Sequence, residues 1–129
     1  MKATKLKILV VDNEKLIADS LVQILNNSGF SASSLYSGFQ AIDRAFTSPF
    51  DVLITDVVMD GMSGIDAAIE IRVILPNCKV LLLSGNQETA AMLEDAHEQG
   101  HNFDIMAKPV HPTVIIDRLK AMCGLELKP

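Results

Sequence analysis

The sequence predicts an α/β fold in which a parallel β-sheet is covered by helices on both faces. Five short runs of aliphatic and β-branched residues alternate with longer stretches in a (βα) pattern, and four of these stretches have apolar residues at helical spacing. The runs are apolar at successive positions, which is typical of strands buried on both faces. Because βαβ units have right-handed crossovers, we expect a doubly wound (βα)5 sandwich of three layers.

Five short segments are predicted to form the strands. Ser31–Tyr36 (SASSLY) is the weakest of them, because it is more polar than the others. The other four are Leu6–Val11 (LKILVV), Asp51–Thr55 (DVLIT), Lys79–Ser84 (KVLLLS) and Phe103–Ala107 (FDIMA). Each is short enough for a buried strand and is separated from the next by a segment of helical period.

Four segments carry a stripe of apolar residues at helical spacing, and each stripe predicts the face of a helix that packs against the sheet. The stripes are Ile17, Leu21, Ile24 and Leu25; Ala41, Ile42, Ala45 and Phe46; Ile65, Ala68, Ile69 and Val73; and Ile115, Leu119 and Met122.

Cap and turn residues mark the ends of these helices. Ser37 and Ser63 stand where helix N-caps are expected, and Pro112 occupies a first helical position. Gly29 and Gly100 are expected to end helices.

The composition fits one globular domain. The chain has 129 residues, of which 49% are hydrophobic and 21% charged, and we expect a single domain over 1–129 with a core of about 6–123. The formal net charge of −5 argues against direct binding to nucleic acid or a membrane surface, since both need a basic face. Two distant cysteines and an N-terminal apolar run too short for a secretory leader predict a cytoplasmic protein.

Four polar residues are expected at one edge of the sheet. Asp12, Asp56, Ser84 and Lys108 each lie at or just past the end of a predicted strand. Parallel strands end at the same edge, and the functional groups of doubly wound sheets gather there. The carboxylates of Asp12 and Asp56 would repel each other unless Lys108 or a divalent cation compensates them, and oxygen ligands suit Mg²⁺.

The residues around these positions resemble a known family. The motifs are KILVVDNE (7–14), DVLITDVVMDGMSG (51–64), LLLSG (81–85) and AKP (107–109). In order and spacing they resemble the receiver domain of response regulators, the chemotaxis-regulator-like phosphoacceptor module of two-component signal transduction, over nearly the whole chain. The resemblance implies a flavodoxin-like sheet with the strand order 2-1-3-4-5.

The resemblance also implies a role for each polar residue at the sheet edge. Asp56 is the expected phosphoacceptor, which takes a phosphoryl group from the phosphohistidine of a sensor histidine kinase or phosphotransfer protein. Asp12 and Asp56 would bind Mg²⁺ together with the backbone carbonyl of Val58. Ser84 would hydrogen-bond the phosphoryl oxygens, and Lys108 would pair with them. Phosphoryl transfer needs mostly positioning and charge neutralisation, which such a site can supply.

The implied protein is a signalling phosphoacceptor rather than an enzyme, although it assists its own phosphotransfer and autodephosphorylation. Phosphorylation is expected to switch its conformation and so regulate an output domain or protein partner. The face of the fourth and fifth helix–strand units is a candidate homodimer surface. The resemblance further implies a cis Lys108–Pro109 bond, and it makes Val58, two residues past the phosphoacceptor, a modulator of hydrolysis.

Three positions depart from the family pattern. Asn13 replaces the second acid of the usual pair, so its amide oxygen is a candidate metal ligand but weaker Mg²⁺ binding is expected. Asp60 replaces a common proline. Ile105 stands where many members have Tyr or Phe, so the usual coupling of serine and aromatic side chains is not assured. Phe103 is expected to pack on the same side of its strand as Ile105.

Residues 97–101 (HEQGH) fit the zinc-protease pattern H-E-x-x-H. Gly100 predicts that the helix ends before His101 can face the same way as His97, so we interpret the match as chance.

Two functions besides phosphoacceptance stay open. One is that of a pseudo-receiver that binds proteins without phosphorylation, which Asn13 makes conceivable. The second is that of a nucleotide or flavin binder, which the lack of a glycine-rich loop after the first strand disfavours.

Overall fold

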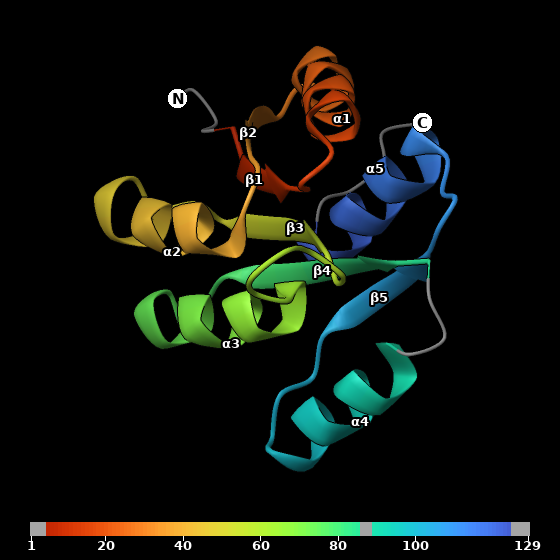
Figure 1. The fold of residues 1–129 in the computed structure, drawn as a ribbon. Coiled ribbons are helices and arrows are strands. Elements are labelled where there is room, and N and C mark those ends of the chain that lie inside the picture. Colours follow the sequence, from red (N-terminus) through yellow and green to blue (C-terminus); the bar gives the residue numbers. More distant parts are fainter. Residues whose placement is uncertain (1–4, 86–88, 125–129) are drawn as a thin grey trace.

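The computed structural model describes residues 5–85 and 89–124. One sheet of parallel strands has the order β2-β1-β3-β4-β5 (Figure 1). The strands are β1 (Lys7–Val11), β2 (Ser31–Leu35), β3 (Val52–Asp56), β4 (Lys79–Ser84) and β5 (Asp104–Ala107). The predicted α/β class and strand order are confirmed, with strand boundaries that differ from the predicted ones by one residue in most cases.

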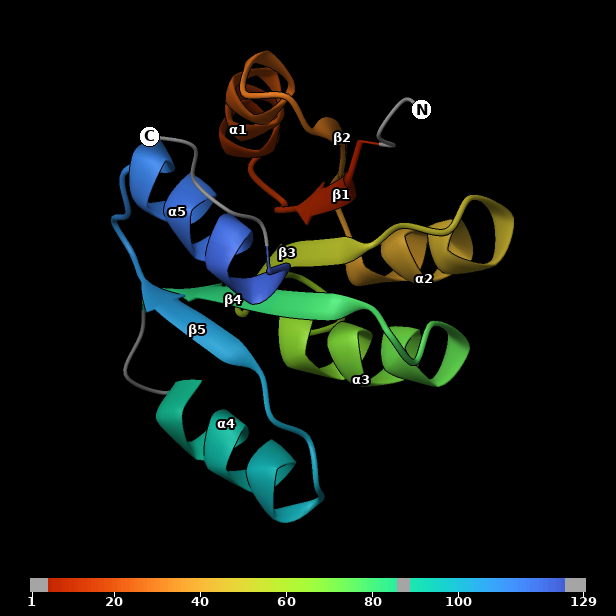
Figure 2. The same cartoon turned by 180° about the vertical axis from the view of Figure 1, so that it is seen from behind.

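Helices cover both faces of the sheet, which confirms the predicted three-layer sandwich. They are α1 (Lys15–Asn27), α2 (Gly38–Thr47), α3 (Gly64–Ile74), α4 (Thr89–Glu98) and α5 (Pro112–Met122). One face carries α2, α3 and α4, and the other carries α1 and α5, with α5 brought to the front in Figure 2. Within the described ranges, no helix is long and apolar enough to cross a membrane.

Each face of the sheet has its own apolar core. Successive strand residues point to opposite faces, so Leu9 and Leu53 pack under α2 and α3, whereas Ile8 and Ile54 pack under α1 and α5. Burying one side chain of this size stabilises the fold by roughly 1.5–3 kcal/mol. The two cores hold the strands in register, and they therefore fix where the carboxyl ends of the strands lie.

The predicted helix ends are confirmed. The Ser37 and Ser63 side chains cap α2 and α3, each accepting a hydrogen bond from a backbone N–H three residues later, at 3.2 and 3.1 Å. Pro112 is the first residue of α5. Gly29 and Gly100 follow α1 and α4 with φ of +98° and +92°, a left-handed conformation that glycine adopts without steric cost.

Four residues of the predicted helical stripes do not belong to the core. Ile17, Ile24, Phe46 and Val73 are 43%, 36%, 68% and 75% exposed, so the prediction that they face the sheet is wrong. Small residues face the sheet in their place, and a small side chain lets the helix lie close while its larger neighbours turn outward. The buried alanines of these helices are Ala18, Ala41, Ala45, Ala67 and Ala68.

Candidate functional site

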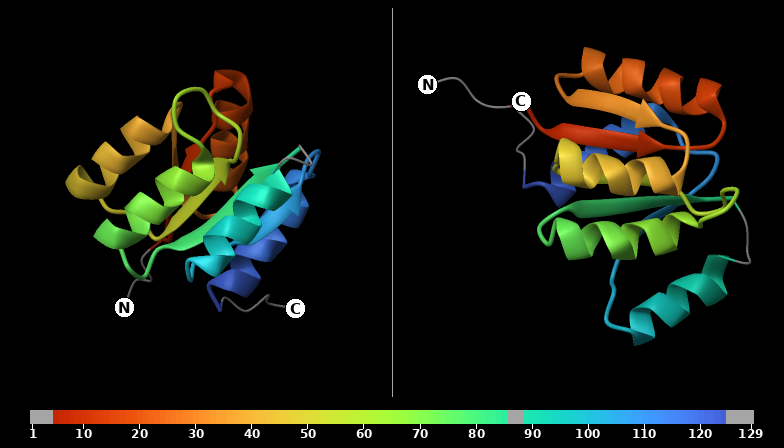
Figure 3. Two further views of the ribbon diagram at one scale, coloured as in Figure 1. Left: turned by 60° about the horizontal axis from the view of Figure 1, so that its bottom comes forward. Right: turned by 60° about the vertical axis from the view of Figure 1, so that its left-hand side comes forward.

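The carboxyl ends of the strands lie at one edge of the sheet, towards which the arrowheads point in the right-hand panel of Figure 3. Asp56 ends β3 and Ser84 ends β4, while Asp12 and Lys108 are the first residues after β1 and β5. Because β1, β3, β4 and β5 are successive neighbours in the sheet, the structure brings these four residues to a common edge.

Lys108 joins the two carboxylates. Its Nζ lies 3.2 Å from Oδ2 of Asp56 and 3.5 Å from Oδ2 of Asp12. The side chains of Asp12, Asp56 and Lys108 are 4%, 12% and 26% exposed. One ammonium group therefore faces two carboxylates in a partly desolvated site, where charges interact more strongly than in water. The cluster retains an excess of negative charge that can attract a further cation.

Burial and charge act on these groups in opposite directions. Burial raises the pKa of the Asp56 carboxyl above its ordinary value, and the neighbouring Asp12 raises it further, while Lys108 only partly offsets the rise. Burial by itself would lower the pKa of Lys108, but attraction to Asp56 and Asp12 outweighs it and the net pKa is raised. Lys108 is therefore firmly cationic, and Asp56 is a more basic carboxylate than an exposed aspartate.

Backbone hydrogen bonds orient both ends of the ionic cluster. Oδ1 of Asp12 accepts a hydrogen bond from the backbone N–H of Glu14 at 2.9 Å, which leaves Oδ2 facing Lys108. The backbone N–H of Lys108 donates to the carbonyl of Ser84 at 2.8 Å. The Lys108–Pro109 peptide bond is cis, as predicted. The backbone of Glu14 thus orients the Asp12 carboxylate, and the backbone of Lys108 is anchored to the end of β4.

The loop after β3 is held by two residues that the sequence did not single out. The Thr55 hydroxyl donates to the backbone carbonyl of Asp56 at 3.0 Å, and the Gly64 N–H donates to the carbonyl of Val57 at 2.8 Å. Val58 follows in this loop with its side chain 54% exposed. A threonine near the end of a strand is an ordinary β-branched residue, so its sequence context gives no signal of this contact.

The departures from the family pattern lie around the ionic cluster and on β5. Asn13 is exposed beside the buried Asp12. Ile105 and Phe103 pack against the same core, which confirms that they share a face of the sheet. The guanidinium of Arg72 lies 5.0 Å from the centre of the Phe103 ring, so the contacts of Phe103 are those of a packing residue.

The HEQGH segment does not form a zinc-binding helix. α4 ends at Glu98, and the Nδ1 atom of His97 hydrogen-bonds Oδ1 of Asn102. His101 lies beyond the helix, where it stacks on Phe103. The expectation that the helix ends before His101 is confirmed. Across residues 5–85 and 89–124, no group of three or more His, Cys, Asp and Glu side chains could hold a metal ion.

A Mg²⁺ site at the sheet edge would therefore depend on few protein ligands. Asp12 and Asp56 supply carboxylate oxygens, and a backbone carbonyl and water can complete the octahedral oxygen set that Mg²⁺ prefers. Oxygen donors and excess negative charge fit this ion. Because the pair of carboxylates already has a partner in Lys108, a bound cation would have to share them with the ammonium group.

Comparison with known proteins agrees with this geometry. The family model described as response regulator receiver domain matches residues 8–120. The response regulator receiver protein CpdR of Brucella abortus is 26% identical over 90% of this chain and 95% of its own length. The chemotaxis protein CheY of Thermotoga maritima is 29% identical over 88% of this chain and 93% of its own length.

Solved structures share the fold. A response regulator receiver domain protein (CheY-like) from Methanospirillum hungatei superposes with a TM-score of 0.83 at 20% identity, covering 94% of this chain and 95% of that one. The likeness shows the shared five-stranded architecture, while the family model spans the strand ends that carry Asp12, Asp56 and Lys108. The chain therefore belongs to the response regulator receiver domain family of two-component signalling.

Proposed function

We propose that this receiver domain accepts a phosphoryl group on Asp56 and passes the signal on through a change of conformation. The observation that carries the proposal is the ionic cluster at the sheet edge, in which Lys108 lies 3.2 Å from Asp56 and 3.5 Å from Asp12. Buried charges without a role are costly to a fold, and a convergent set of them in a strand-end position is typical of a reacting site.

The chemistry follows from the surroundings of Asp56. A carboxylate oxygen of Asp56 attacks the phosphorus of a phosphohistidine, the P–N bond breaks, and the imidazole leaves with the bonding electron pair. A raised pKa makes the Asp56 carboxylate a better nucleophile. Lys108 pairs with the phosphoryl oxygens, whose charge is spread in a loose transition state. Ser84, at the end of β4, is the proposed hydrogen-bond donor to the same oxygens.

Asp12, Asp56 and the backbone carbonyl of Val58 are the proposed Mg²⁺ ligands. A bound Mg²⁺ would neutralise negative charge around the incoming phosphoryl group. Asn13 offers a neutral amide oxygen from an exposed position, and because it has no negative charge it contributes less to the ion than the usual carboxylate would.

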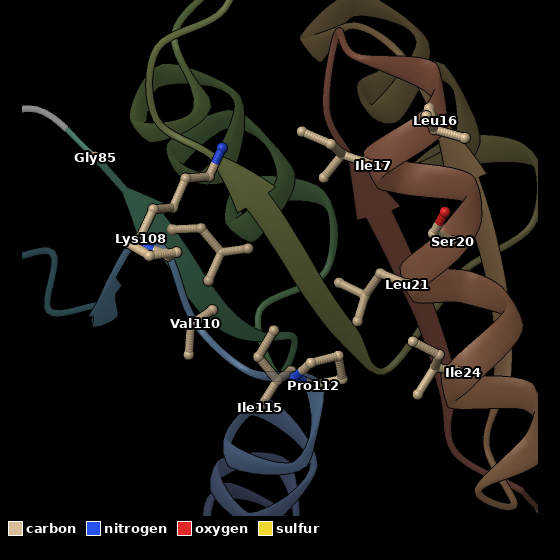
Figure 4. Close-up of a pocket in the computed structure, with 12 residues that line it drawn as sticks. Leu16, Ile17, Ser20, Leu21, Ile24, Gly85, Lys108, Val110, Pro112 and Ile115 are labelled. Atoms are coloured by element: carbon tan, nitrogen blue, oxygen red, sulfur yellow. The ribbon is translucent and has the colours of Figure 1, made fainter.

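The surface beside the cluster supports a protein donor. A largely apolar groove of about 650 Å³ lies between α1 and the start of α5, and Lys108 and Gly85 form its end next to the ionic cluster. In Figure 4 the α1 side chains Ile17 and Leu21 point towards the α5 side of the groove, and Leu16 lines it at the top of the helix. Such grooves accept the apolar face of an amphipathic helix. We propose that the phosphohistidine-bearing helix of the donor binds here.

Labelling with a small phosphodonor tests the phosphoacceptor directly. Incubation with acetyl phosphate and Mg²⁺ should add one phosphoryl mass to the wild-type protein, and Asp56→Asn should abolish the addition. The matched control is Asp60→Asn, which removes an exposed carboxylate from the same loop and should label normally. Equal labelling of Asp56→Asn would refute the assignment. A wild-type protein that stays unlabelled would favour a pseudo-receiver that binds proteins without phosphorylation.

A further inference from the structure

Thr55 is an unusual residue for its place in the sheet. Its side chain is 1% exposed, and Asp12 and Thr55 are the polar side chains that are fully buried among the described residues. Within β3 it follows the apolar residues Val52, Leu53 and Ile54. A valine would fill the same volume without a hydroxyl group that needs a partner. The hydroxyl must therefore be explained by what it contacts.

The Thr55 hydroxyl contacts the loop that follows Asp56. Its Oγ1 donates to the backbone carbonyl of Asp56 at 3.0 Å and lies 4.0 Å from the sulfur of Met59, three residues past Asp56. These two contacts reach both the start and the middle of the segment that carries Val58.

Gly64 lies against the same carbonyl. A Cβ at Gly64 would lie 2.0 Å from the backbone oxygen of Asp56 and 3.0 Å from Oγ1 of Thr55, so only glycine fits. The Gly64 N–H also donates to the carbonyl of Val57 at 2.8 Å. Two successive carbonyls, those of Asp56 and Val57, are therefore fixed before the chain reaches Val58.

We propose that Thr55 is a positioning residue for the phosphoacceptor loop. By holding the Asp56 carbonyl against Gly64, its hydroxyl sets the direction in which the carboxylate of Asp56 and the carbonyl of Val58 are presented to Mg²⁺. The inference rests on the proposed function, because both groups belong to the proposed metal site. Thr55 itself contacts neither the metal nor the phosphoryl group.

Three substitutions separate positioning from packing. Thr55→Val keeps the shape of the side chain and removes the hydroxyl, whereas Thr55→Ser keeps the hydroxyl and removes a methyl group. Ile54→Val is the matched control, since it removes one methyl group from a buried neighbour that points to the opposite face. The readouts are the Mg²⁺ affinity from calorimetric titration, the labelling rate with acetyl phosphate at varied Mg²⁺, and the melting temperature.

Thr55→Val should weaken Mg²⁺ binding about fivefold, the equivalent of one ordinary net hydrogen bond. Its labelling rate should recover at saturating Mg²⁺. Thr55→Ser should bind Mg²⁺ like the wild type, and Ile54→Val should lower the melting temperature without changing the affinity. Unchanged Mg²⁺ affinity in Thr55→Val would overturn the inference, as would equal weakening by Ile54→Val or Thr55→Ser.

The two proposals fail in different ways. If the wild type binds Mg²⁺ but is never labelled, the proposed function fails while the titrations still decide the role of Thr55. If the wild type is labelled and Thr55→Val matches it at every Mg²⁺ concentration, the inference fails alone. A wild type without measurable Mg²⁺ binding would overturn the positioning role as well.

Discussion

At the scale of single residues, the position of Asp56 that suits its proposed role lowers the stability of the fold. Its carboxylate is buried near a second carboxylate, and burial raises its pKa in spite of Lys108. The folded state therefore binds a proton at Asp56 more readily than the unfolded state does. Between the ordinary pKa of 3.8 and the raised one, the free energy of unfolding falls as pH rises.

Asp56→Asn should therefore stabilise the protein at pH 7. The amide removes a charge that the folded state holds at a cost, so the melting temperature should rise. The gain should shrink as the pH is lowered through the raised pKa, and it should be lost below 3.8, where the carboxyl is protonated in both states. Lys108 does not add to this pH dependence, because the stability that its raised pKa gives is lost only at alkaline pH. Thermal unfolding from pH 4.5 to pH 7 measures the difference.

Asp60→Asn controls for the loss of one negative charge from the same loop. It should shift the melting temperature less than Asp56→Asn at pH 7, since Asp60 is exposed. If Asp56→Asn were less stable than the wild type throughout this range, attraction to Lys108 would outweigh the cost of burying the Asp56 carboxylate.

Val58→Asn is expected to shorten the lifetime of phosphorylated Asp56. The Val58 side chain is 54% exposed, two residues past Asp56, and it has no polar atom to orient an attacking water. An amide in its place can do so, and we expect hydrolysis to accelerate severalfold at saturating Mg²⁺, less than the roughly hundredfold effect of a full general base. The decay of phosphoprotein after removal of acetyl phosphate, followed by intact mass, measures the lifetime.

Val73→Asn makes the same chemical change at an exposed valine on α3, which is 75% exposed, and it should leave the decay rate unchanged. Identical decay of Val58→Asn and the wild type would place control of water access at another residue. Asn86 would then be the next candidate, although it lies outside the described residues.

The charged residues of the site were predicted from the sequence, but the residues that hold the loop after β3 were not. Asp12, Asp56 and Lys108 could be selected because the strand-end rule acts on residues whose charge is visible in the sequence. Thr55 and Gly64 act through backbone carbonyls, and their partners are set by how the loop turns after β3. A hydroxyl at a strand end has many available acceptors, so no pattern of residues identifies the one it contacts.

At the scale of elements, α1 is fixed to the edge strand β2 by polar contacts. The amide of Asn26 bonds both backbone groups of Ala32, accepting from its N–H at 2.7 Å and donating to its carbonyl at 3.2 Å. Asp19 accepts hydrogen bonds from the hydroxyls of Ser34 and Tyr36, both at 2.7 Å. The two Asn26 bonds occupy backbone groups at Ala32 on the outer edge of the strand, which would otherwise be open, and the Asp19 bonds tie its side chains to α1.

Asn26→Ala should loosen this edge. The substitution removes two hydrogen bonds to β2, and the free energy of unfolding should fall by about 1 kcal/mol, since the bonds are exposed. Asn27→Ala is the matched control, because it removes the exposed neighbouring amide from the same last turn of α1 and leaves both bonds to Ala32 in place. Chemical denaturation of both variants gives the difference. Equal stability of the two would mean that water replaces Asn26 at no cost.

Helical periodicity located the helices but not every buried face. The predicted stripe of α1 included Ile17 and Ile24, whereas Ala18, Leu21 and Leu25 are the buried residues. Apolar residues at helical spacing occur both on the buried face of a helix and along an open groove. The spacing alone therefore does not show which of them are buried. The exposed Ile17 and Ile24 line the groove beside α5.

At the scale of the whole molecule, the two faces of the sheet differ in the apolar surface that their helices leave exposed. The face under α2, α3 and α4 leaves Phe39, Phe46 and Val73 exposed outside its core. On the other face, α1 is bound to β2 and leaves the apolar groove open towards α5. Exposed apolar surface of this kind is typical of an interaction site. The groove and the ionic cluster share Lys108, so a partner in the groove lies beside Asp56.

Leu16→Ser tests whether the groove receives the phosphodonor. Leu16 is 80% exposed at the groove, so the change should leave the fold intact and slow phosphotransfer from an autophosphorylated sensor histidine kinase roughly tenfold, as for loss of an interface anchor. Acetyl phosphate should label the variant at the wild-type rate, because a small donor needs no groove. Val73→Ser, 75% exposed on the opposite face, should change neither rate. Rapid-quench transfer kinetics measure both, and equal transfer by Leu16→Ser and the wild type would mean that the donor binds elsewhere.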